Sequence, residues 1–403
     1  MLTLDEAQQK LMAAIVRGTG TEEVALGRAL GRYLSALVPA RVDNPAFDNS
    51  AMDGYAVATA DLVAARGRLR VVGEASCGDS PGRLSPGTTM RIFTGAPVPI
   101  GADSVVMQED VVREADEARF ATTPAVGQYI RRRGEDFRSD EQLYAPGQRL
   151  RAQDLALLSA AGVAEVPVRR RPRALVVATG NELVAPGTPL QPGQIYESNR
   201  LATLLWLESA GAEAIDGGTV RDEPAALRTL LARADEYDFV ITSGGASVGD
   251  HDLVKQVFAE IGQIDFWRVK IKPGKPVAFG KIGNQTHFFS LPGNPVSSLV
   301  TFKLFVEPAL AAWHGASYRM PLMSAVAAAD YSRRDAARME FLRARLTQDG
   351  AQLVAEVLQG QGSHQIGTMR RTNALLRVDV DVSAFRKGDT VTVMPLGEGL
   401  AAG

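Results

Sequence analysis

The spacing of apolar residues at the start of the chain predicts a helix. Apolar positions recur every three or four residues between 4 and 15, which places them on one helix face. Thr3 and Glu6 have the spacing of a capping box, so this helix should begin directly after Thr3. A second apolar stretch near residues 24–37 is also interpreted as a helix.

The pattern then becomes β-rich. From about residue 41 to 140, short apolar runs alternate with Gly and Pro turns, as in GYAV and RIFTGAPVP. Residues 151–162 return to a helical pattern, with Gly162 in the position that ends a helix. The sequence therefore predicts a helical linker domain at residues 1–40 and 140–168, interrupted by a β-rich inserted domain at residues 41–139.

Strands and helices alternate through residues 169–318. The runs ALVVAT (174–179), FVIT (239–242) and HFFSL (287–291) are almost continuously apolar, and helical patterns separate them. Strands of this kind are buried on both faces in a mostly parallel sheet covered by helices. This region is predicted to be a three-layer α/β domain.

The last part of the chain alternates with a period of two. Segments such as MEFLRARL, NALLRVDVDV and DTVTVMPL are typical of half-buried strands. Residues 319–403 are therefore predicted to form a C-terminal β-barrel, with a small β-sandwich as the alternative that the pattern leaves open. The predicted fold class is thus α/β and β multidomain.

Composition narrows the functional classes. The chain has 403 residues, with 44 Lys+Arg against 46 Asp+Glu and 45% hydrophobic residues. This balance argues against nucleic acid or an anionic membrane as a partner, since either would need a basic excess. The N-terminus lacks a signal-peptide pattern, and no uninterrupted apolar run is long enough to span a membrane, so a cytoplasmic location is expected. One cysteine, Cys77, and four scattered histidines exclude a Cys-rich zinc site and an HExxH helix.

Three glycine-rich loops follow predicted strands. They are TGNEL (179–183), SGGASVGD (243–250) and LPGNP (291–295). Ligands of open α/β sheets bind at the carboxyl ends of strands, where glycines let backbone N–H groups approach an anion. None of the loops matches a Walker or a G-x-G-x-x-G pattern, so a P-loop NTPase or a Rossmann dehydrogenase is disfavoured. The alternative is that each loop merely ends a strand.

Charged residues accompany these loops. Oxygen ligands of the type that Mg²⁺ prefers are offered by Glu182, Asp222 and Asp252. Asp222 and Asp252 also occupy expected helix N-cap positions, and capping alone would explain their presence. Lys272 and Lys275 lie in the Pro/Gly-framed turn IKPGKP, where a stiff backbone would position them for an oxyanion. The run RRRGED (131–136) is more typical of a solvated surface.

The motifs of the chain occur in the order of a known family. DNSAMDGYAV, RIFTGAPVPIGADSVVMQED, IRRRGED, TGNEL, GQIYESN, SGGASVGDHD, IKPGKPVAFG and LPGNPVSS resemble the molybdopterin molybdenumtransferases, the bacterial counterparts of the gephyrin E domain. The resemblance runs from about residue 3 to the C-terminus. It implies insertion of molybdate into adenylylated molybdopterin with release of AMP, with Mg²⁺ as the cofactor.

The resemblance also assigns roles to particular positions. Catalytic roles are implied for Asp53, Thr94, Glu182, Asp222 and Asp252, and metal binding for Glu182, Asp222 and Asp252. Together with the glycine-rich loops, it implies substrate binding by Gly180, Ser243, Gly244, Gly245, Ser247, Gly249, Lys272, Lys275, Pro292, Gly293, Asn294, Pro295, Arg338 and Ser363. Asn181 departs from the family, which often has Asp there, and this would remove one charge from the site.

The resemblance further implies a homodimer whose active site combines the α/β domain of one subunit with the inserted domain of the other. Implied partners beyond the substrates are molybdopterin adenylyltransferase and apo-molybdoenzymes. Three alternatives stay open: an adenylyltransferase on the same α/β unit, a scaffold such as the gephyrin E domain also provides, and an insertase specific for tungstate.

Overall fold

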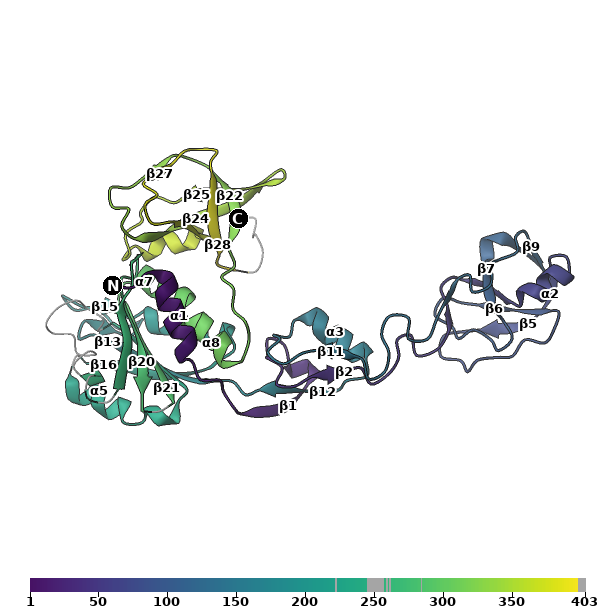
Figure 1. Ribbon diagram of the computed structural model, residues 1–403, viewed down its shortest axis with the longest axis horizontal. Helices are drawn as coiled ribbons and strands as arrows, with labels where there is room; N and C mark the ends of the chain where they lie inside the picture. The colour runs from purple at the N-terminus through teal and green to yellow at the C-terminus, as the bar shows by residue number, and fades with distance from the viewer. Residues whose placement is uncertain (222, 245–256, 259, 261, 284, 398–403) are drawn as a thin grey trace. The chain divides into compact units, whose positions relative to one another are not determined.

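The chain forms two compact units. The computed structural model describes residues 1–403 except 222, 245–256, 259, 261, 284 and 398–403 (Figure 1). Unit 1 comprises Met1–Glu22 and Arg169–Gly403, and unit 2 comprises Glu23–Val168. Unit 2 is therefore a single insertion into the sequence of unit 1. The finer domain boundaries given above stay predictions.

The α/β part of unit 1 is built on a six-stranded sheet. The strands are β13 (Arg173–Thr179), β16 (Glu213–Val220), β17 (Phe239–Ser243), β18 (Gly262–Arg268), β20 (Pro276–Ile282) and β21 (Thr286–Leu291). Their order is β16-β13-β17-β21-β20-β18. The first four are parallel, β20 is antiparallel to β21, and β18 is antiparallel to β20. The predicted mostly parallel sheet is confirmed, and every residue of β17 and β21 is buried.

Helices cover both faces of this sheet. They are α1 (Leu4–Ala14), α4 (Asn199–Ser209), α5 (Pro224–Leu231), the short η3 (Ala234–Glu236), α7 (Pro295–Thr301), the π-helical turn η4 (Phe302–Val306) and α8 (Glu307–Trp313). Alternate residues of β13 enter two separate cores. Ala174 and Val176 pack with α1, α4 and the α7–α8 helix, whereas Leu175 and Val177 pack with α5. The predicted three-layer arrangement is thus confirmed.

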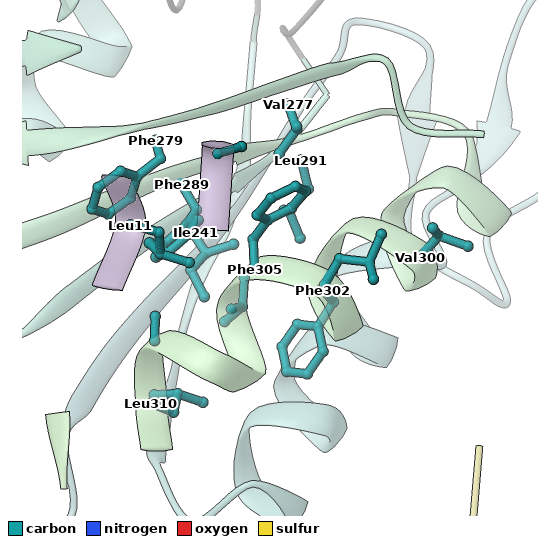
Figure 2. Close-up of a cluster of buried hydrophobic side chains, with 14 of the residues drawn as sticks. Leu11, Ile241, Val277, Phe279, Phe289, Leu291, Val300, Phe302, Phe305 and Leu310 are labelled. Atoms are coloured by element: carbon teal, nitrogen blue, oxygen red, sulfur yellow. The ribbon is translucent and has the colours of Figure 1, made fainter. Parts of the chain in front are cut away.

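The larger core explains why one helix is so apolar. Figure 2 shows Ile241 and Phe289 of the sheet together with Leu11 of α1 and Phe305 of the long helix. The continuous helix Pro295–Trp313 contains an 18-residue window with a mean hydropathy of 1.3, and by length and composition it could cross a membrane. In this fold 83% of its most apolar window is buried inside the protein. Burial in the core therefore accounts for its composition.

The C-terminal part of unit 1 is a closed barrel, as predicted. Its strands are β22 (Met323–Ala327), β24 (Met339–Asp349), β25 (Gln352–Val357), β26 (Ala374–Val378) and β28 (Thr390–Pro395). The order β24-β25-β22-β28-β26 closes because β26 pairs back to β24. The smaller elements are the β23 (Tyr331–Ser332) and β27 (Ala384–Phe385) pair and η5 (Ile366–Arg371). One further strand, β19 (Ile271–Lys272), comes from the α/β part and pairs with β24.

The linker part of unit 2 contains less helix than the sequence predicts. Its elements are β1 (Thr21–Ala25), η1 (Leu26–Arg28), β2 (Val38–Pro39), β11 (Gln142–Tyr144), α3 (Ala152–Ala160) and β12 (Glu165–Arg169). The predicted helix near residues 24–37 is wrong, because Gly31 takes a positive φ of 74° and interrupts it. Leu34 and Val38 instead enter the core from irregular or extended backbone, packed beside Leu158 of α3.

The rest of unit 2 is the β-rich insertion. Its six-stranded sheet has the order β7-β4-β6-β5-β9-β8. The elements are β3 (Asn49–Ser50), β4 (Gly54–Val57), α2 (Thr59–Ala64), β5 (Arg68–Ala75), β6 (Thr88–Ile92), β7 (Ser104–Met107), η2 (Gln108–Asp110), β8 (Val111–Glu114), β9 (Glu117–Phe120) and β10 (Ile130–Arg131). The predicted β-rich insertion is therefore observed, with one short helix.

Candidate active site

The three glycine-rich loops of the α/β part meet at one edge of the sheet. Strands β13, β17 and β21 are neighbours and parallel, so their carboxyl ends lie together. The Gly244 N–H donates to the Leu291 carbonyl at 3.2 Å. A Cβ on Gly244 would lie 2.5 Å from the Thr179 carbonyl oxygen. The loops are in direct contact, and at Gly244 only a glycine fits between them.

This edge opens into a cavity of about 1190 Å³ that also extends to the C-terminal barrel. The pair β14 (Leu183–Val184) and β15 (Ile195–Tyr196) lies beside it. Twelve of the residues predicted from the sequence line this cavity, namely Gly180, Glu182, Ser243, Gly244, Lys272, Lys275, Pro292, Gly293, Asn294, Pro295, Arg338 and Ser363. The structure thus brings them together, whereas their individual roles stay predictions.

Other predicted site residues are not part of this group. Asp222, Gly245, Ser247, Gly249 and Asp252 lie outside the residues that the structure describes. Asp53 and Thr94 belong to unit 2. The predicted site residues therefore come from both units of the chain.

Asp53 and Thr94 form a local pair in the insertion. Asp53 Oδ1 accepts hydrogen bonds from the Thr94 N–H at 2.7 Å and from the Thr94 hydroxyl at 2.9 Å. These two bonds, the backbone one first, lower the pKa of Asp53. The Cys77 thiol donates to the Thr94 carbonyl at 3.1 Å, so this cysteine also holds the turn. The pair presents an ionised carboxylate beside a fixed tight turn.

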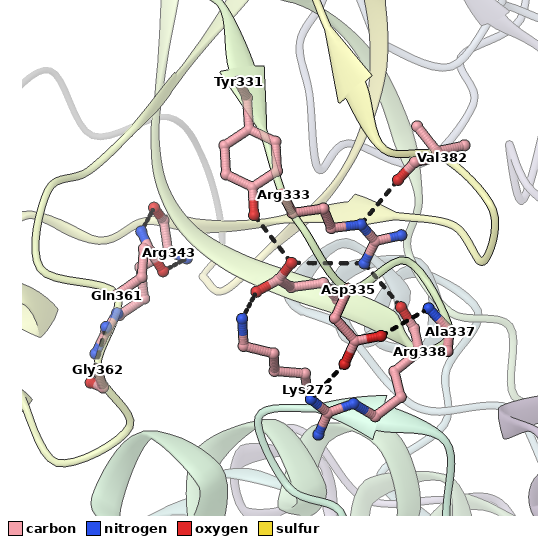
Figure 3. Close-up of polar contacts among 11 residues, drawn as sticks. Lys272, Tyr331, Arg333, Asp335, Ala337, Arg338, Arg343, Gln361, Gly362 and Val382 are labelled. Atoms are coloured by element: carbon pink, nitrogen blue, oxygen red, sulfur yellow. Dashed lines mark hydrogen bonds and ion pairs between the residues drawn. The ribbon is translucent and has the colours of Figure 1, made fainter.

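Two cations of the unit 1 cavity are held by acidic residues of the barrel. The Lys272 ammonium lies 2.7 Å from Glu340 Oε1, and the Arg338 guanidinium lies 2.9 Å from Asp335 Oδ2 (Figure 3). The pKa of Asp335 is lowered by the Ala337 N–H and then by Arg338. Both cations are therefore oriented before any ligand arrives.

The Glu182 carboxylate folds back over its own loop. A Cβ on Gly180 would lie 2.7 Å from Glu182 Oε2, so only glycine allows this approach. The backbone of Glu182 is fixed by a 2.8 Å hydrogen bond that its carbonyl accepts from the Ile195 N–H. No cluster of three His, Cys, Asp or Glu side chains occurs among the described residues, and two predicted metal ligands fall outside them.

Several residues of the cavity were missed by the sequence reasoning. Asn199 lines the cavity and donates through Nδ2 to the Gly293 carbonyl at 2.7 Å. Glu197, only 5% exposed, accepts from the Arg200 N–H at 2.6 Å and caps the start of α4. Glu340, 3% exposed, lies in an otherwise apolar stretch of β24. The available signals were the unassigned GQIYESN motif and a charged residue inside an apolar strand.

The arginine run of the insertion has a structural role. Arg132 pairs with Asp48 at 2.6 Å and Arg133 with Asp43 at 2.5 Å. The Ser139 N–H, followed by Arg133, lowers the pKa of Asp43. The chain passes between the linker part and the inserted part of unit 2 twice. These ion pairs connect the two passing segments to each other.

Known protein families and proteins match the chain along most of its length. Three family models match the chain in order: "MoeA N-terminal region (domain I and II)" at residues 2–162, "Probable molybdopterin binding domain" at 175–312 and "MoeA C-terminal region (domain IV)" at 325–396. A molybdopterin molybdenumtransferase of Haemophilus influenzae is 38% identical over 401 residues, 98% of each chain. The chain belongs to the MoeA family of molybdopterin molybdenumtransferases.

Further relatives extend this match. The molybdopterin molybdenumtransferase 2 of Mycobacterium tuberculosis is 36% identical and covers 97% of this chain, which in turn spans 99% of that protein. A crystal structure of the MoeA protein of Pyrococcus horikoshii OT3 superposes with a TM-score of 0.84 at 30% identity, covering 98% of this chain and 100% of that one. MoeA relatives thus share all parts of the chain, which disfavours an adenylyltransferase that needs the α/β part alone.

Proposed function

We propose that this MoeA-family chain inserts molybdate into adenylylated molybdopterin, releasing AMP and yielding the molybdenum cofactor. The observation that carries the proposal is the single cavity where three glycine-rich strand ends meet Lys272, Lys275 and Arg338. Backbone N–H groups beside glycines suit phosphate oxygens, and the cations suit a tetrahedral dianion. A cavity of about 1190 Å³ is large enough for a nucleotide-sized substrate together with the anion.

Catalysis in this proposal is positional and electrostatic. The pyrophosphate of the substrate would lie at the strand ends near Gly180, Gly244 and Gly293, beside the start of the helix at Pro295. The lysine turn would hold molybdate close to the dithiolene that receives the molybdenum. Because the reacting groups are held next to each other in the right orientation, the reaction does not depend on an encounter between separate molecules. The cations would also balance the negative charge of the anions as the pyrophosphate linkage is cleaved.

Mg²⁺ is the proposed cofactor. The side chains near Glu182 that line the cavity offer oxygen atoms rather than thiols, since the one cysteine of the chain lies in unit 2. Oxygen donors fit a hard cation such as Mg²⁺. Glu182 would hold the ion, with Asp222 and Asp252 proposed as further ligands. When bound, the ion would neutralise charge on the pyrophosphate. The pyrophosphate cleavage should accordingly stop with a chelator and return with added Mg²⁺.

A homodimer is proposed because the predicted catalytic residues belong to two different compact units. Asp53 and Thr94 lie in unit 2, and the cavity lies in unit 1. In the proposed dimer the insertion of one subunit completes the cavity of the other. Mixing Asp53→Ala chains with Glu182→Ala chains should then restore up to one intact site per heterodimer. Verified subunit exchange without recovery of activity would contradict a shared site.

The proposed cellular setting follows from the substrates. We place the enzyme in the cytoplasm, after a molybdopterin adenylyltransferase and before the apo-molybdoenzymes that take up the finished cofactor. Soluble, negatively charged substrates fit a cavity that is lined by cationic side chains.

The central experiment incubates the purified chain with adenylylated molybdopterin, Mg²⁺ and molybdate. AMP release and activation of an apo-molybdoenzyme are followed together. Lys275→Gln should slow both, whereas Lys281→Gln, on β20 and outside the cavity, should slow neither. Consumption of ATP with metal-free molybdopterin would instead indicate an adenylyltransferase. Activity with tungstate but not molybdate would indicate a tungsten insertase, and no turnover at all would favour a scaffold.

A further inference from the structure

Lys272 belongs to two parts of unit 1 at once. Its backbone lies in β19, which falls between strands β18 and β20 of the α/β sheet in sequence but pairs with strand β24 of the barrel. The register sets Ile271 opposite Met339 and Lys272 opposite Glu340. Side chains that face each other across paired strands lie on the same side of the sheet. The barrel therefore fixes where the Lys272 side chain leaves the backbone.

Glu340 is an unusual residue for this position. It is 3% exposed, in a strand whose neighbouring residues Met339 and Phe341 are buried apolar side chains. Removing a carboxylate from water is costly unless charged and hydrogen-bonding partners replace the water. An unpaired carboxylate at the edge of an anion-binding cavity would repel the ligand. The presence of Glu340 there therefore has to be explained by the residues that it contacts.

The partners of Glu340 satisfy both of its oxygens. Oε2 accepts from the Tyr331 hydroxyl at 2.9 Å and lies 3.5 Å from Arg333 Nη1, while Oε1 lies 2.7 Å from the Lys272 ammonium. Figure 3 shows Lys272, Tyr331 and Arg333, with dashed lines for these three contacts. Tyr331 and Arg333 hold Oε2 of Glu340 in place. The other oxygen, Oε1, is thereby directed at the Lys272 ammonium.

Arg333 is itself immobilised. It donates to the Arg338 carbonyl at 2.7 Å and to the Val382 carbonyl at 2.8 Å, and its side chain is 4% exposed. Arg333, Glu340 and Lys272 together carry a net charge of about +1. Arg333 therefore balances the carboxylate, and the charge of Lys272 stays available to an anion. Lys272 and Glu340 both line the cavity, and Lys272, with 51% of its side chain exposed against 4% for Glu340, is the more accessible of the two to an anion.

We propose that Glu340 is the positioning residue of the oxyanion site, holding the Lys272 ammonium in place through a buried carboxylate that Arg333 and Tyr331 fix. The inference deepens the proposed function and rests on it, since molybdate is the oxyanion in question. A free lysine would have to give up its side-chain freedom on binding, whereas a held lysine has already done so. The barrel in this way takes part in binding the anion.

The test uses the full-length chain and the conservative variant Glu340→Gln. The amide can still accept from Tyr331 but offers Lys272 no charge. Molybdate binding, measured by calorimetry, should weaken about tenfold, the loss typical of one charged hydrogen bond. Glu307→Gln is the matched control, because Glu307 pairs with Lys303 at 2.9 Å on the long helix and does not line the cavity. It should leave molybdate binding unchanged.

Two further readouts separate positioning from general damage. Acetic anhydride should label Lys272 several-fold faster in Glu340→Gln than in the wild type, by mass spectrometry, while Lys275 keeps its rate. In a Lys272→Gln background, Glu340→Gln should cause no further loss of molybdate binding. Tyr331→Phe leaves the ion pair between Glu340 and Lys272 in place, so it should weaken molybdate binding only two- to threefold. This variant replaces Glu340→Gln in the test if Glu340→Gln does not fold.

The outcomes are distinguishable. Equal labelling of Lys272 in wild type and Glu340→Gln would overturn the positioning role whatever the anion does. Additive losses in the double variant would overturn it too, because Glu340 would then act other than through Lys272. If the wild type binds no molybdate although the labelling changes, the proposed function fails, and with it the role of Glu340 at an oxyanion site.

Discussion

Asn199 of α4 is joined to Gly293 by a 2.7 Å hydrogen bond from Nδ2 to the glycine carbonyl. The bond ties the first residue of a helix to the PGN turn that precedes another helix. Both residues line the cavity. Because the Gly293 carbonyl is held from this side, the N–H groups of the turn keep a fixed direction, as the proposed binding of the substrate pyrophosphate requires.

Asn199→Ala should therefore loosen the turn without unfolding α4. We expect kcat/KM for AMP release to fall about tenfold, the usual effect of losing one orienting hydrogen bond at a charged ligand. The control is Gln194→Ala, which removes a bond that the side chain makes only within its own turn, to the Gln191 N–H. Equal activity of the two variants would contradict a role for Asn199 in the site.

Arg343 is the buried cation that shapes the Ser363 loop. It is 0% exposed and donates to the carbonyls of Gly360, Gln365 and Gly362 at 2.6, 3.0 and 3.0 Å. Burial lowers the pKa of Arg343, because removal from water disfavours the charged guanidinium. The loop that it holds supplies the Ser363 carbonyl to the Val296 N–H at 3.1 Å, which connects the barrel to the start of α7.

Replacing Arg343 by Met should leave the carbonyls of Gly360, Gln365 and Gly362 without their guanidinium donor. The free energy of unfolding should fall by about 3 kcal/mol, measured by urea denaturation. Arg377→Met, in the neighbouring strand β26, removes a more exposed pair with Asp379 and should cost less than about 1 kcal/mol. A cost for Arg343→Met no larger than that of Arg377→Met would show that the loop does not depend on this guanidinium.

The meeting of the three loops could be predicted from the sequence because it follows from one rule of geometry. The apolar runs at β13, β17 and β21 indicated parallel strands, and parallel strands bring their carboxyl ends to one edge. Once the strands are identified, the positions of Gly180, Ser243 and Gly293 need no further information. The sequence prediction therefore agrees with the structure in the part of the site that the strand topology determines.

The acidic partners of the cavity cations could not be predicted in this way. Lys272 and Glu340 meet only because β19 joins the barrel with one particular register, and nothing local in either segment specifies that pairing. The failed helix near residues 24–37 has a related cause. Its apolar spacing suits a helix, but the contacts that Leu34 makes with Leu158 and Val168 outweigh local propensity.

Buried His287 should make the stability of unit 1 depend on pH. Burial lowers its pKa to about 4, and Nε2 accepts from the Val16 N–H at 3.3 Å, so the ring is neutral in the folded state. An unfolded histidine has a pKa near ~6.5. Between pH 4 and 6.5 only the unfolded chain binds the proton, so the free energy of unfolding should rise by about 3 kcal/mol across this window and level off above it.

The measurement is urea unfolding from pH 4.5 to 7.5, followed by tryptophan fluorescence. His287→Gln keeps an acceptor for Val16 but cannot take up the proton, so most of the dependence on pH should disappear. His364→Gln, at an exposed position, should retain it. A slope that survives in His287→Gln would assign the effect to other groups.

Gly274 lets the lysine turn lie directly against α7. Its φ is 104°, and a Cβ there would come within 2.6 Å of Thr301 Cγ2. Gly283 also has a positive φ, of 58°, but a Cβ on it would meet no atom within 4 Å. The two glycines thus share the backbone requirement and differ in the space around them.

Gly274→Ala should push the turn away from the helix and displace Lys272 and Lys275 from the cavity. We expect molybdate binding to weaken at least tenfold, whereas Gly283→Ala should leave binding unchanged and cost about 1 kcal/mol of stability for its positive φ. Thr301→Ser removes the methyl group that the new Cβ would meet and keeps the hydroxyl, which donates to the Ser297 carbonyl at 2.8 Å. Combined with Gly274→Ala, it should recover part of the lost affinity. If Gly274→Ala binds molybdate as well as Gly283→Ala does, contact with α7 does not determine where the lysines lie.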